Sequence, residues 1–172
     1  MSGFALIRRV NDVPAVTTRR ATAADAAELA RLRFEFRTAI HDAVETEVGF
    51  RERCERWMAE RLATSDWYAW IAARTEDVLG NIWLNVFHKV PNPVGEPEAY
   101  GYITNLYVVP GLRGGGVGSR LLDAAVEECR ARGVDTVLLW PTPRSRGLYV
   151  RHGFVDTDDV LGLYLTGHED AR

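Results

Sequence analysis

Apolar residues recur every three or four positions over the first part of the chain, which predicts two amphipathic helices. A capping box, Thr22-Ala-Ala-Asp25, marks the start of the first helix. Its apolar face consists of Leu29, Leu32, Phe36 and Ile40. The second helix carries a stripe of Phe50, Cys54, Trp57, Met58 and Leu62. A strand over residues 16–20 precedes both helices, and a polar connection over residues 41–49 separates them.

The hydrophobic period changes to two after residue 66, which predicts strands. Residues 67–73 and 78–87 alternate in this way around the short turn Thr75-Glu-Asp, so we expect a hairpin. Three prolines in residues 91–97 predict a loop, because proline cannot donate to a sheet ladder. Residues 99–109 predict a long strand that ends at Pro110.

The remaining third of the chain alternates helices and strands. Residues 118–132 predict a helix with Gly133 as its C-terminal cap, followed by a strand over 136–140 and a short helix over 145–151. Two closing strands are expected over 154–155 and 160–165. The predicted order is therefore β-α-α-β-β-β-α-β-α-β-β, an α/β (α+β) fold. Its twisted sheet is mixed but mostly antiparallel, with about four flanking helices and one parallel unit over residues 99–140.

Length and composition predict one globular domain. A chain of 172 residues with 47% hydrophobic residues can bury a sizeable core. We expect an N-terminal extension over residues 1–15, a domain over 16–166 and a tail over 167–172. No apolar run approaches a membrane span, and no signal sequence is recognised, so the prediction is a cytoplasmic protein without membrane contact. The net charge of −3 and the lack of a basic block argue against nucleic-acid binding.

The two cysteines do not point to a metal or a disulfide. Cys54 and Cys129 each occupy an apolar position of a predicted helix, so both are expected to be reduced core residues. No cluster of cysteine and histidine has the spacing of zinc ligands, and we expect no metal.

Four glycines lie among residues 114–118, between a predicted strand and a predicted helix. Glycine lets a ligand approach the backbone, and a helix N-terminus offers free N–H groups, so this loop can hold a pyrophosphate. A flexible connector is the alternative. A Walker loop lacks its lysine here, because Ser119 and Arg120 follow Gly118. A Rossmann loop is disfavoured by its position after antiparallel hairpins, although Asp135 has a suitable spacing.

Two motifs indicate a coenzyme A site. Arg113-x-x-Gly116-x-Gly118 resembles the Arg/Gln-x-x-Gly-x-Gly/Ala motif of the GNAT superfamily of N-acetyltransferases. The stretch Ser145-Arg-Gly-Leu-Tyr149-Val-Arg-His-Gly153-Phe154 resembles a second element of that family at the expected distance. The resemblance spans residues 16–166 and includes the order of the elements. It implies an acyltransferase that moves an acetyl group from acetyl-CoA to a primary amine, by direct attack in a ternary complex.

The resemblance also implies roles for particular residues. The pantetheine arm would lie along the backbone of Leu106 and Val108, and the Leu106 N–H would polarise the acetyl carbonyl as a catalytic oxyanion donor. Tyr149 would face the sulfur and protonate the leaving thiolate, unless it is a core tyrosine. The cofactor-binding residues implied are Leu106, Val108, Arg113, Gly114, Gly115, Gly116, Val117, Gly118 and Ser119.

The general base and the acceptor are left open by the sequence. Tyr102 stands where some family members carry a carboxylate, which leaves Glu98, His88, His41 and Asp42 as candidate bases. Thr142 replaces the second motif's asparagine, and Arg144 and Arg146 either contact phosphates or lie in solvent. The acceptor, a small-molecule or peptide amine, would meet Phe36, residues 42–47, Trp83 and Trp140. A non-catalytic CoA-binding module is the alternative function, and a homodimer is compatible with the family.

Overall fold

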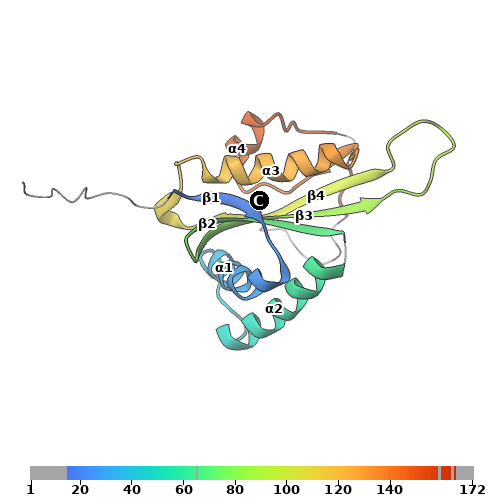
Figure 1. Cartoon of the computed structure of the whole chain (residues 1–172). Coiled ribbons are helices and arrows are strands. Elements are labelled where there is room, and N and C mark those ends of the chain that lie inside the picture. The colour runs from blue at the N-terminus through green and yellow to red at the C-terminus, as the bar shows by residue number, and fades with distance from the viewer. Residues whose placement is uncertain (1–14, 65, 159, 164, 166–172) are drawn as a thin grey trace, which may run out of the picture.

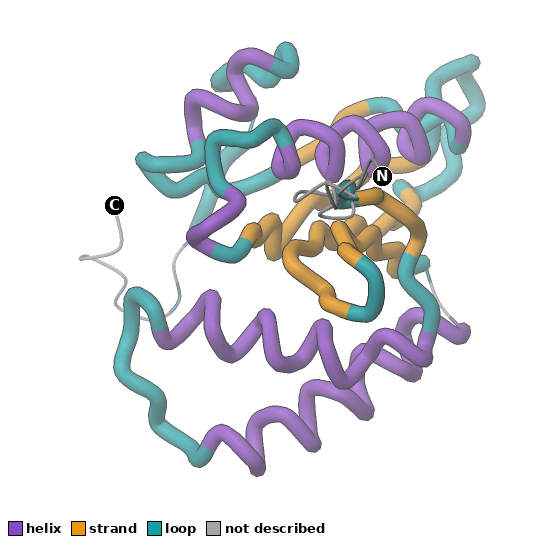
Figure 2. The backbone as a smooth tube through the Cα atoms, turned by 60° about the vertical axis from the view of Figure 1, so that its left-hand side comes forward, coloured by secondary structure: helices purple, strands orange, loops and turns teal. Residues whose placement is uncertain are grey.

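Alternating apolar residues build a five-stranded sheet whose two faces are both covered by helices. The computed structural model describes residues 15–64, 66–158, 160–163 and 165. The helices α1 and α2 pack on one face of the sheet and α3 and α4 lie on the other (Figures 1 and 2). The elements are β1 Thr17–Arg20, η1 Ala23–Asp25, α1 Ala26–Thr38, α2 Glu47–Thr64, β2 Trp67–Arg74, β3 Asp77–His88, β4 Ala99–Val108, η2 Pro110–Leu112, α3 Val117–Ala131, β5 Thr136–Leu138 and α4 Arg146–Arg151.

The strands follow one another across the sheet in the order β1-β2-β3-β4-β5. The first four pair antiparallel, whereas β5 pairs parallel with β4. The α3 crossover between them is required because parallel neighbours cannot be joined by a tight turn. This arrangement confirms the predicted fold class, including the single parallel unit.

The period of two in the central strands divides the core into two layers. Trp70, Ile82 and Leu84 pack with the buried face of α3. Their neighbours Ile71 and Trp83 point the other way, toward α1 and α2. Trp83 is therefore a core residue, and its expected place in an acceptor pocket is not found.

The first helix begins and ends close to its predicted bounds. Asp25 accepts a hydrogen bond from the backbone N–H of Thr22 at 2.8 Å, which is the return half of the predicted capping box. Leu29 and Leu32 are fully buried, as their spacing predicts. Ile40 lies beyond the last turn of α1 and is exposed, so the apolar stripe is shorter than expected.

The two predicted closing strands are not formed in the residues that the structure describes. Residues 154–158, 160–163 and 165 adopt no regular structure. The cause is visible at the end of α4, where Gly153 has a φ of 86° and the Phe154 N–H donates to the Tyr149 carbonyl at 3.1 Å. This C-terminal cap engages Phe154. Apolar residues further on, such as Leu161 and Leu163, are exposed and show that alternation without a neighbouring strand does not make a ladder.

Both cysteines lie where helical spacing placed them. Cys129 on α3 is buried, Cys54 on α2 is half-buried, and both are free thiols. Burial raises the pKa of Cys129 to about 11, which makes its thiolate scarce at neutral pH. Cys129 is thus a small apolar side chain of the core.

The close approach of β3 and β4 at Gly80 generates a first prediction. A Cβ at Gly80 would lie 2.9 Å from the Tyr107 carbonyl oxygen, which is backbone and cannot swing away. We expect Gly80→Ala to lower the free energy of unfolding by about 1–3 kcal/mol, as overpacking does. Denaturant unfolding measures the change. Gly95→Ala is the matched control, because a Cβ there meets nothing within 4 Å, and equal stability losses in both variants would contradict the prediction.

Candidate active site

Strand β4 separates from β5 halfway along its length. The parallel pairing covers only Tyr100 with Thr136, Gly101 with Val137 and Tyr102 with Leu138. Beyond Tyr102 that edge of β4 faces a cavity of about 630 Å³, a volume typical of ligand sites. Residues of β4, the glycine loop, α1 and α4 line it. Backbone groups on such an edge need a partner, and an extended ligand can supply one.

An extra residue in β4 accompanies the separation. Asn81 pairs with Tyr107 and Trp83 pairs with Thr104, so two residues of β4 lie opposite one of β3. Asn105 in this bulge has a φ of 54°, a left-handed conformation that asparagine tolerates better than most residues. Its side-chain amide donates to Asn81 Oδ1 at 3.0 Å and accepts from Arg33 Nη1 at 3.2 Å. The bulge is thereby tied both to the core and to α1.

The glycine loop presents its backbone to the cavity. Gly114 and Gly116 have φ values of 81° and 78°, and Gly116 is the N-cap of α3. The first N–H groups of a helix have no partner within the helix, and the helix dipole makes this end electropositive. Gly118 and Ser119 in the first turn also line the cavity. These features fit an anionic pyrophosphate.

Arg113 joins the glycine loop to β4. Its Nε donates to the Val108 carbonyl oxygen at 2.8 Å, and its guanidinium carbon lies 5.4 Å from the centre of the Tyr107 ring. A carbonyl oxygen has two lone pairs, so Val108 retains an acceptor site. Arg113 is held at the mouth of the cavity, beside the loop, with further N–H donors for a phosphate.

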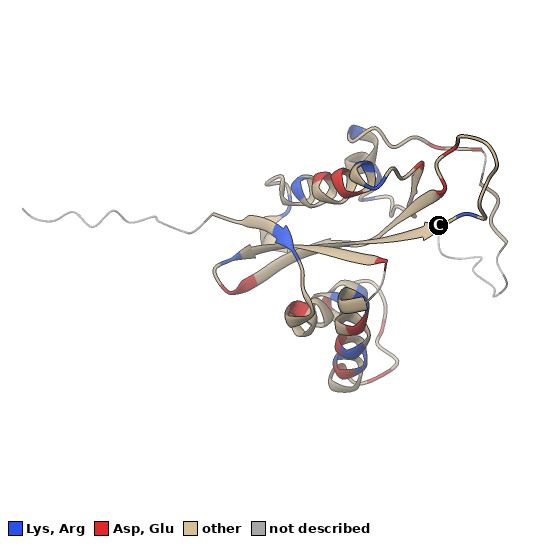
Figure 3. Cartoon of the chain, turned by 45° about the vertical axis from the view of Figure 1, so that its right-hand side comes forward, with Lys and Arg blue, Asp and Glu red and all other residues tan. Residues whose placement is uncertain are grey.

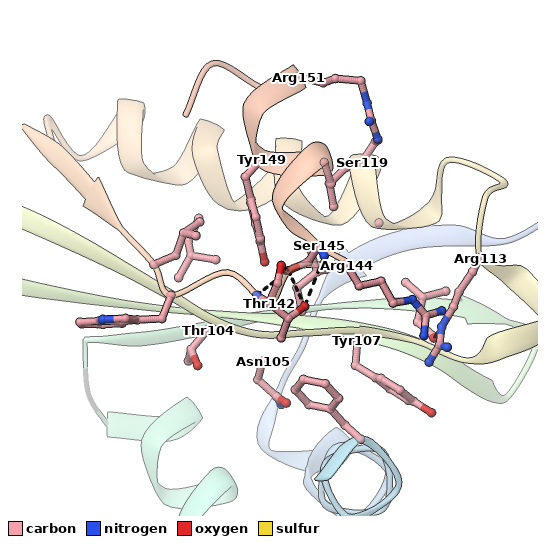
Figure 4. Close-up of a pocket in the computed structure, with 18 of the residues that line it drawn as sticks. Thr104, Asn105, Tyr107, Arg113, Ser119, Thr142, Arg144, Ser145, Tyr149 and Arg151 are labelled. Carbon is pink, nitrogen blue, oxygen red and sulfur yellow. Dashed lines mark hydrogen bonds between the residues drawn. The ribbon is translucent and has the colours of Figure 1, made fainter. Parts of the chain in front are cut away.

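Tyr149, on α4, also lines the cavity. Figure 4 shows Tyr149 and Ser119 on one side of β4, while Asn105 and Tyr107 project toward α1 on the other. The ring of Tyr149 packs against Phe154 at a centroid distance of 5.7 Å and is only 8% exposed. This burial raises the pKa of Tyr149 to about 12, so the phenol keeps its proton at neutral pH and can donate it.

The start of α4 is fixed by a reciprocal pair that sequence reasoning missed. Thr142 N–H donates to Ser145 Oγ at 3.0 Å, and Ser145 N–H donates to Thr142 Oγ1 at 3.3 Å (Figure 4, dashed lines). Both residues line the cavity. Because α4 has only six residues, this pair orients Tyr149. The spacing of two hydroxyl residues before a short helix was the available signal.

The cavity brings together most of the predicted cofactor-binding residues. Its lining includes Leu106, Val108, Arg113, Gly114, Gly116, Gly118, Ser119 and Tyr149. Gly115 and Val117 do not line it: Gly115 is exposed, and Val117, the first residue of α3, is buried in the core. Tyr102, Phe36, Arg144 and Trp140 do line it, and Trp140 is 72% exposed.

The candidate bases lie elsewhere. His41 and Asp42 border a separate shallow depression at the end of α1, and residues 42–47 do not reach the cavity. The Glu98 carboxylate accepts from the Asn92 N–H at 2.8 Å and so belongs to the β3–β4 loop. His88 is exposed at the end of β3. Arg146 forms an ion pair with Asp156 rather than lining the cavity.

The charges around the cavity have one sign. Basic and acidic residues are interspersed along the helices on both sides of the sheet (Figure 3). Among the residues that the structure describes, by contrast, the cavity lining contains no Asp, Glu, Lys or His and five arginines, which are Arg33, Arg37, Arg113, Arg144 and Arg151. The net charge of −3 for the whole chain does not indicate that arginines gather in this cavity. The site is suited to a ligand with several negative charges.

Comparison with known proteins agrees with this geometry. The model of the Acetyltransferase (GNAT) family matches residues 28–154. A crystal structure described as a predicted acetyltransferase with acetyl-CoA, from Clostridium acetobutylicum, superposes with a TM-score of 0.74 and 25% identity, covering 90% of this chain and 99% of that one. The family match and the shared fold define an acyltransferase, and the open strand edge beside a glycine loop suits that class. The chain belongs to the GNAT family of acetyltransferases.

Two curated relatives are similar over shorter segments. Glucosamine 6-phosphate N-acetyltransferase 1 of Oryza sativa is 36% identical over 64 residues, which are 37% of this chain and 39% of the relative. Mycothiol acetyltransferase of Beutenbergia cavernae is 41% identical over 80 residues, 45% of this chain and 24% of the relative. The matches therefore span well under half of either relative.

Two further features of the described residues bear on earlier expectations. None of their helices is long and apolar enough to cross a membrane. No three His, Cys, Asp or Glu side chains in that part of the chain are grouped as metal ligands would be.

The bulge generates a second prediction. Asn105→Ala removes the donor to Asn81 Oδ1, which is fully buried, and places an alanine at a positive φ. We expect a loss of about 1–3 kcal/mol in the free energy of unfolding. Asn105→Gly loses the same hydrogen bond but accepts the backbone conformation, so its loss should be smaller by about 1 kcal/mol. Thermal unfolding of both variants measures the difference, and identical stabilities would show that the φ of residue 105 carries no strain.

Proposed function

We propose that this chain transfers an acetyl group from acetyl-CoA to a primary amine by direct attack in a ternary complex. The observation that carries the proposal is the edge of β4 that β5 leaves free, with the glycine loop and Tyr149 lining the same cavity. One curated relative is named as an N-acetyltransferase of glucosamine 6-phosphate, and the C. acetobutylicum relative is described with acetyl-CoA. The first description supports an amine acceptor, and the second supports a CoA thioester donor.

The backbone of β4 orients the donor. Leu106 and Val108 line the cavity on the edge that β5 leaves free, so their backbone groups are available to pair with an extended pantetheine arm. The Leu106 N–H is the proposed donor to the acetyl oxygen, where negative charge develops during attack. Arg113 and the amides of the loop and the first turn of α3 are the proposed partners of the pyrophosphate.

Acetyl-CoA supplies an activated acetyl group and a thiolate leaving group. The amine nitrogen forms the new bond to the carbonyl carbon and releases one proton to water, the carbon–sulfur bond breaks, and the thiolate takes a proton. Tyr149 is the proposed source of that proton, because its raised pKa keeps the phenol protonated where the amine is reactive. The phenolate then regains a proton from solvent.

The amine must be neutral when it attacks, and the described residues that line the cavity include no carboxylate or imidazole to deprotonate it. The cluster of arginines lowers the pKa of a nearby ammonium, since like charges disfavour its charged form. We therefore propose that the amine loses its proton to water on entry. The same lack of a base favours the alternative function, a CoA-binding module without turnover. Thiol release from acetyl-CoA with a panel of amines separates the two functions.

The third prediction concerns the loop. Gly116→Val places a branched side chain at a φ of 78°, over the amides that should hold the pyrophosphate. Space is not the obstacle, since a Cβ there would meet only Arg120 Nη1, at 3.6 Å. We expect acetyl-CoA affinity to fall about ten-fold or more, a cost near 1.4 kcal/mol, measured by calorimetry.

The control for this variant is Gly111→Val, because Gly111 has an ordinary φ and nothing within 4 Å of a Cβ. It should bind acetyl-CoA as the unaltered chain does. If Gly116→Val binds equally well, the pyrophosphate is held elsewhere. If the unaltered chain shows neither heat nor thermal stabilisation with millimolar acetyl-CoA, the proposed function is wrong.

The fourth prediction concerns Tyr149. Tyr149→Phe keeps the ring against Phe154 and removes only the proton donor. We expect kcat to fall by about 10²–10⁴-fold while acetyl-CoA affinity stays constant, because the loss belongs to the transition state. Single-turnover acetyl transfer measures the chemical step directly. In the unaltered chain, the rate should show no alkaline decline below about pH 10, because the pKa of the phenol is raised and not lowered.

Tyr100→Phe is the matched control, since Tyr100 packs against Phe87 as Tyr149 packs against Phe154, and it does not line the cavity. Its kcat should be unchanged. A Tyr149→Phe variant with an unaltered single-turnover rate would remove Tyr149 from the mechanism. A lower melting temperature without a change in rate would assign it a packing role only.

A further inference from the structure

Arg33 is a half-buried cation without a carboxylate partner. It lies on α1, lines the cavity, and donates from Nη1 to Asn105 Oδ1 at 3.2 Å. Burial lowers the pKa of Arg33, and the nearby Arg37 lowers it further. No carboxylate of the described residues forms an ion pair with it, and a buried charge without a partner is costly.

The acidic residues of α1 serve a different arginine. Arg31 forms ion pairs with both Glu28 and Glu35, and it also donates to the Val78 carbonyl at 2.9 Å. Arg31 does not line the cavity. The same helix thus neutralises the arginine that faces away from the cavity and leaves the one that faces into it without an anion.

A second arginine stands one turn further on. Arg37 also lines the cavity, and no ion pair of Arg37 occurs among the described residues. Like charges at i and i+4 on a helix destabilise it, so Arg33 and Arg37 raise the free energy of α1 when nothing lies between them. An anion bound by both side chains would remove that repulsion.

Arg33 and the first turn of α3, which is part of the proposed phosphate site, lie on opposite sides of β4. Arg33 contacts Asn105 at the bulge, on the side of β4 that faces α1, whereas Ser119 and Tyr149 lie on the other side (Figure 4). Tyr102 of β4 lies near Arg33, and its ring packs against Trp140 at a centroid distance of 5.2 Å. Phe36 stands between the two arginines in sequence and lines the same space. This end of the cavity is both cationic and aromatic.

We propose that the acceptor is an amine that also carries an anionic group, a carboxylate or a phosphate, bound by Arg33 and Arg37. The inference rests on the proposed acetyl transfer and names the substrate class of that site. A guanidinium has five N–H donors in a planar fork that matches carboxylate and phosphate oxygens, and only one donor of Arg33 is engaged by Asn105. The anion would anchor the acceptor at α1 and leave its amine toward β4.

The test compares paired acceptors in a thiol-release assay. One pair is phenylalanine and phenylalaninamide, which tests a carboxylate, and the other is phosphoethanolamine and ethanolamine, which tests a phosphate. We expect a higher kcat/KM for the anionic member of at least one pair. The amide has the less basic amine and so the larger neutral fraction, which biases the first pair against the proposal.

Variants assign the preference to the two arginines. Arg33→Met keeps an apolar stem of similar length and removes the charge, so KM for the anionic acceptor should rise about 10–100-fold, as expected for a lost charged hydrogen bond. KM for the neutral partner and the affinity for acetyl-CoA should change little. Arg37→Met should also raise KM for the anionic acceptor, and Arg33→Lys should raise it less than Arg33→Met does. Arg56→Met is the control, since Arg56 is exposed on α2 and outside the cavity lining.

The possible outcomes distinguish failure of the anionic acceptor from failure of the proposed acetyl transfer. Equal kcat/KM for both members of both pairs overturns the anionic acceptor and leaves acetyl transfer intact. If Arg33→Met lowers kcat/KM equally for neutral and anionic acceptors, Arg33 has a structural role, and the anionic acceptor is overturned as well. If acetyl-CoA binds but no acceptor turns over, the two anionic amines are titrated into the protein–CoA complex by calorimetry. If neither of them binds, the anionic acceptor is overturned. Failure to bind acetyl-CoA overturns the proposed function, and this inference with it.

Discussion

The site depends on the pairing of β4, which is continuous on one edge and interrupted on the other. Pairing with β3 runs the length of the strand, while pairing with β5 stops after Tyr102. On that edge, the backbone N–H and C=O groups beyond Tyr102 have no strand beside them among the described residues, and such groups need partners when a ligand excludes water. The bulge at Asn105 occurs at the same level, and its side chain links Asn81 of the core to Arg33 of α1. A core hydrogen bond therefore sets the shape of the cavity and the position of one of its charges.

Charge is the second constraint, and it is distributed unevenly. The chain is slightly acidic, yet in the described part of the chain the cavity lining holds five arginines and no carboxylate. Many carboxylates are engaged in exposed ion pairs within or near the helices, as Glu28 and Glu35 are with Arg31. Such pairs contribute little to stability, but they leave the arginines of the cavity available for anions. Arg113 is held at the Val108 carbonyl beside the glycine loop, and Arg33 is held at Asn105 in the bulge, so cations stand at two places along β4.

Most of the elements could be predicted because each rests on a local period or cap. The alternation around Trp70 and Ile82, and the helical stripe around Leu121, were enough to place β2, β3 and α3. Prediction failed for the closing strands, since the alternation of apolar residues there has no neighbouring strand and Phe154 caps α4 instead. Prediction from the sequence also suggested Glu98, His88, His41 and Asp42 as bases, but none of them lines the cavity. Residue type alone does not tell where a side chain points.

The sequence by itself determined the β-α-β unit with its glycine loop and the short helix that carries Tyr149, because φ preferences, caps and periodicity act over a few residues. Only the tertiary structure decided that Arg33, Tyr102 and Trp140 share one end of a cavity, since they come from three elements distant in the chain. It also decided that Trp83 belongs to the core and Trp140 to the site. The physical reason is that burial and charge pairing depend on which surfaces meet, and no local pattern records that.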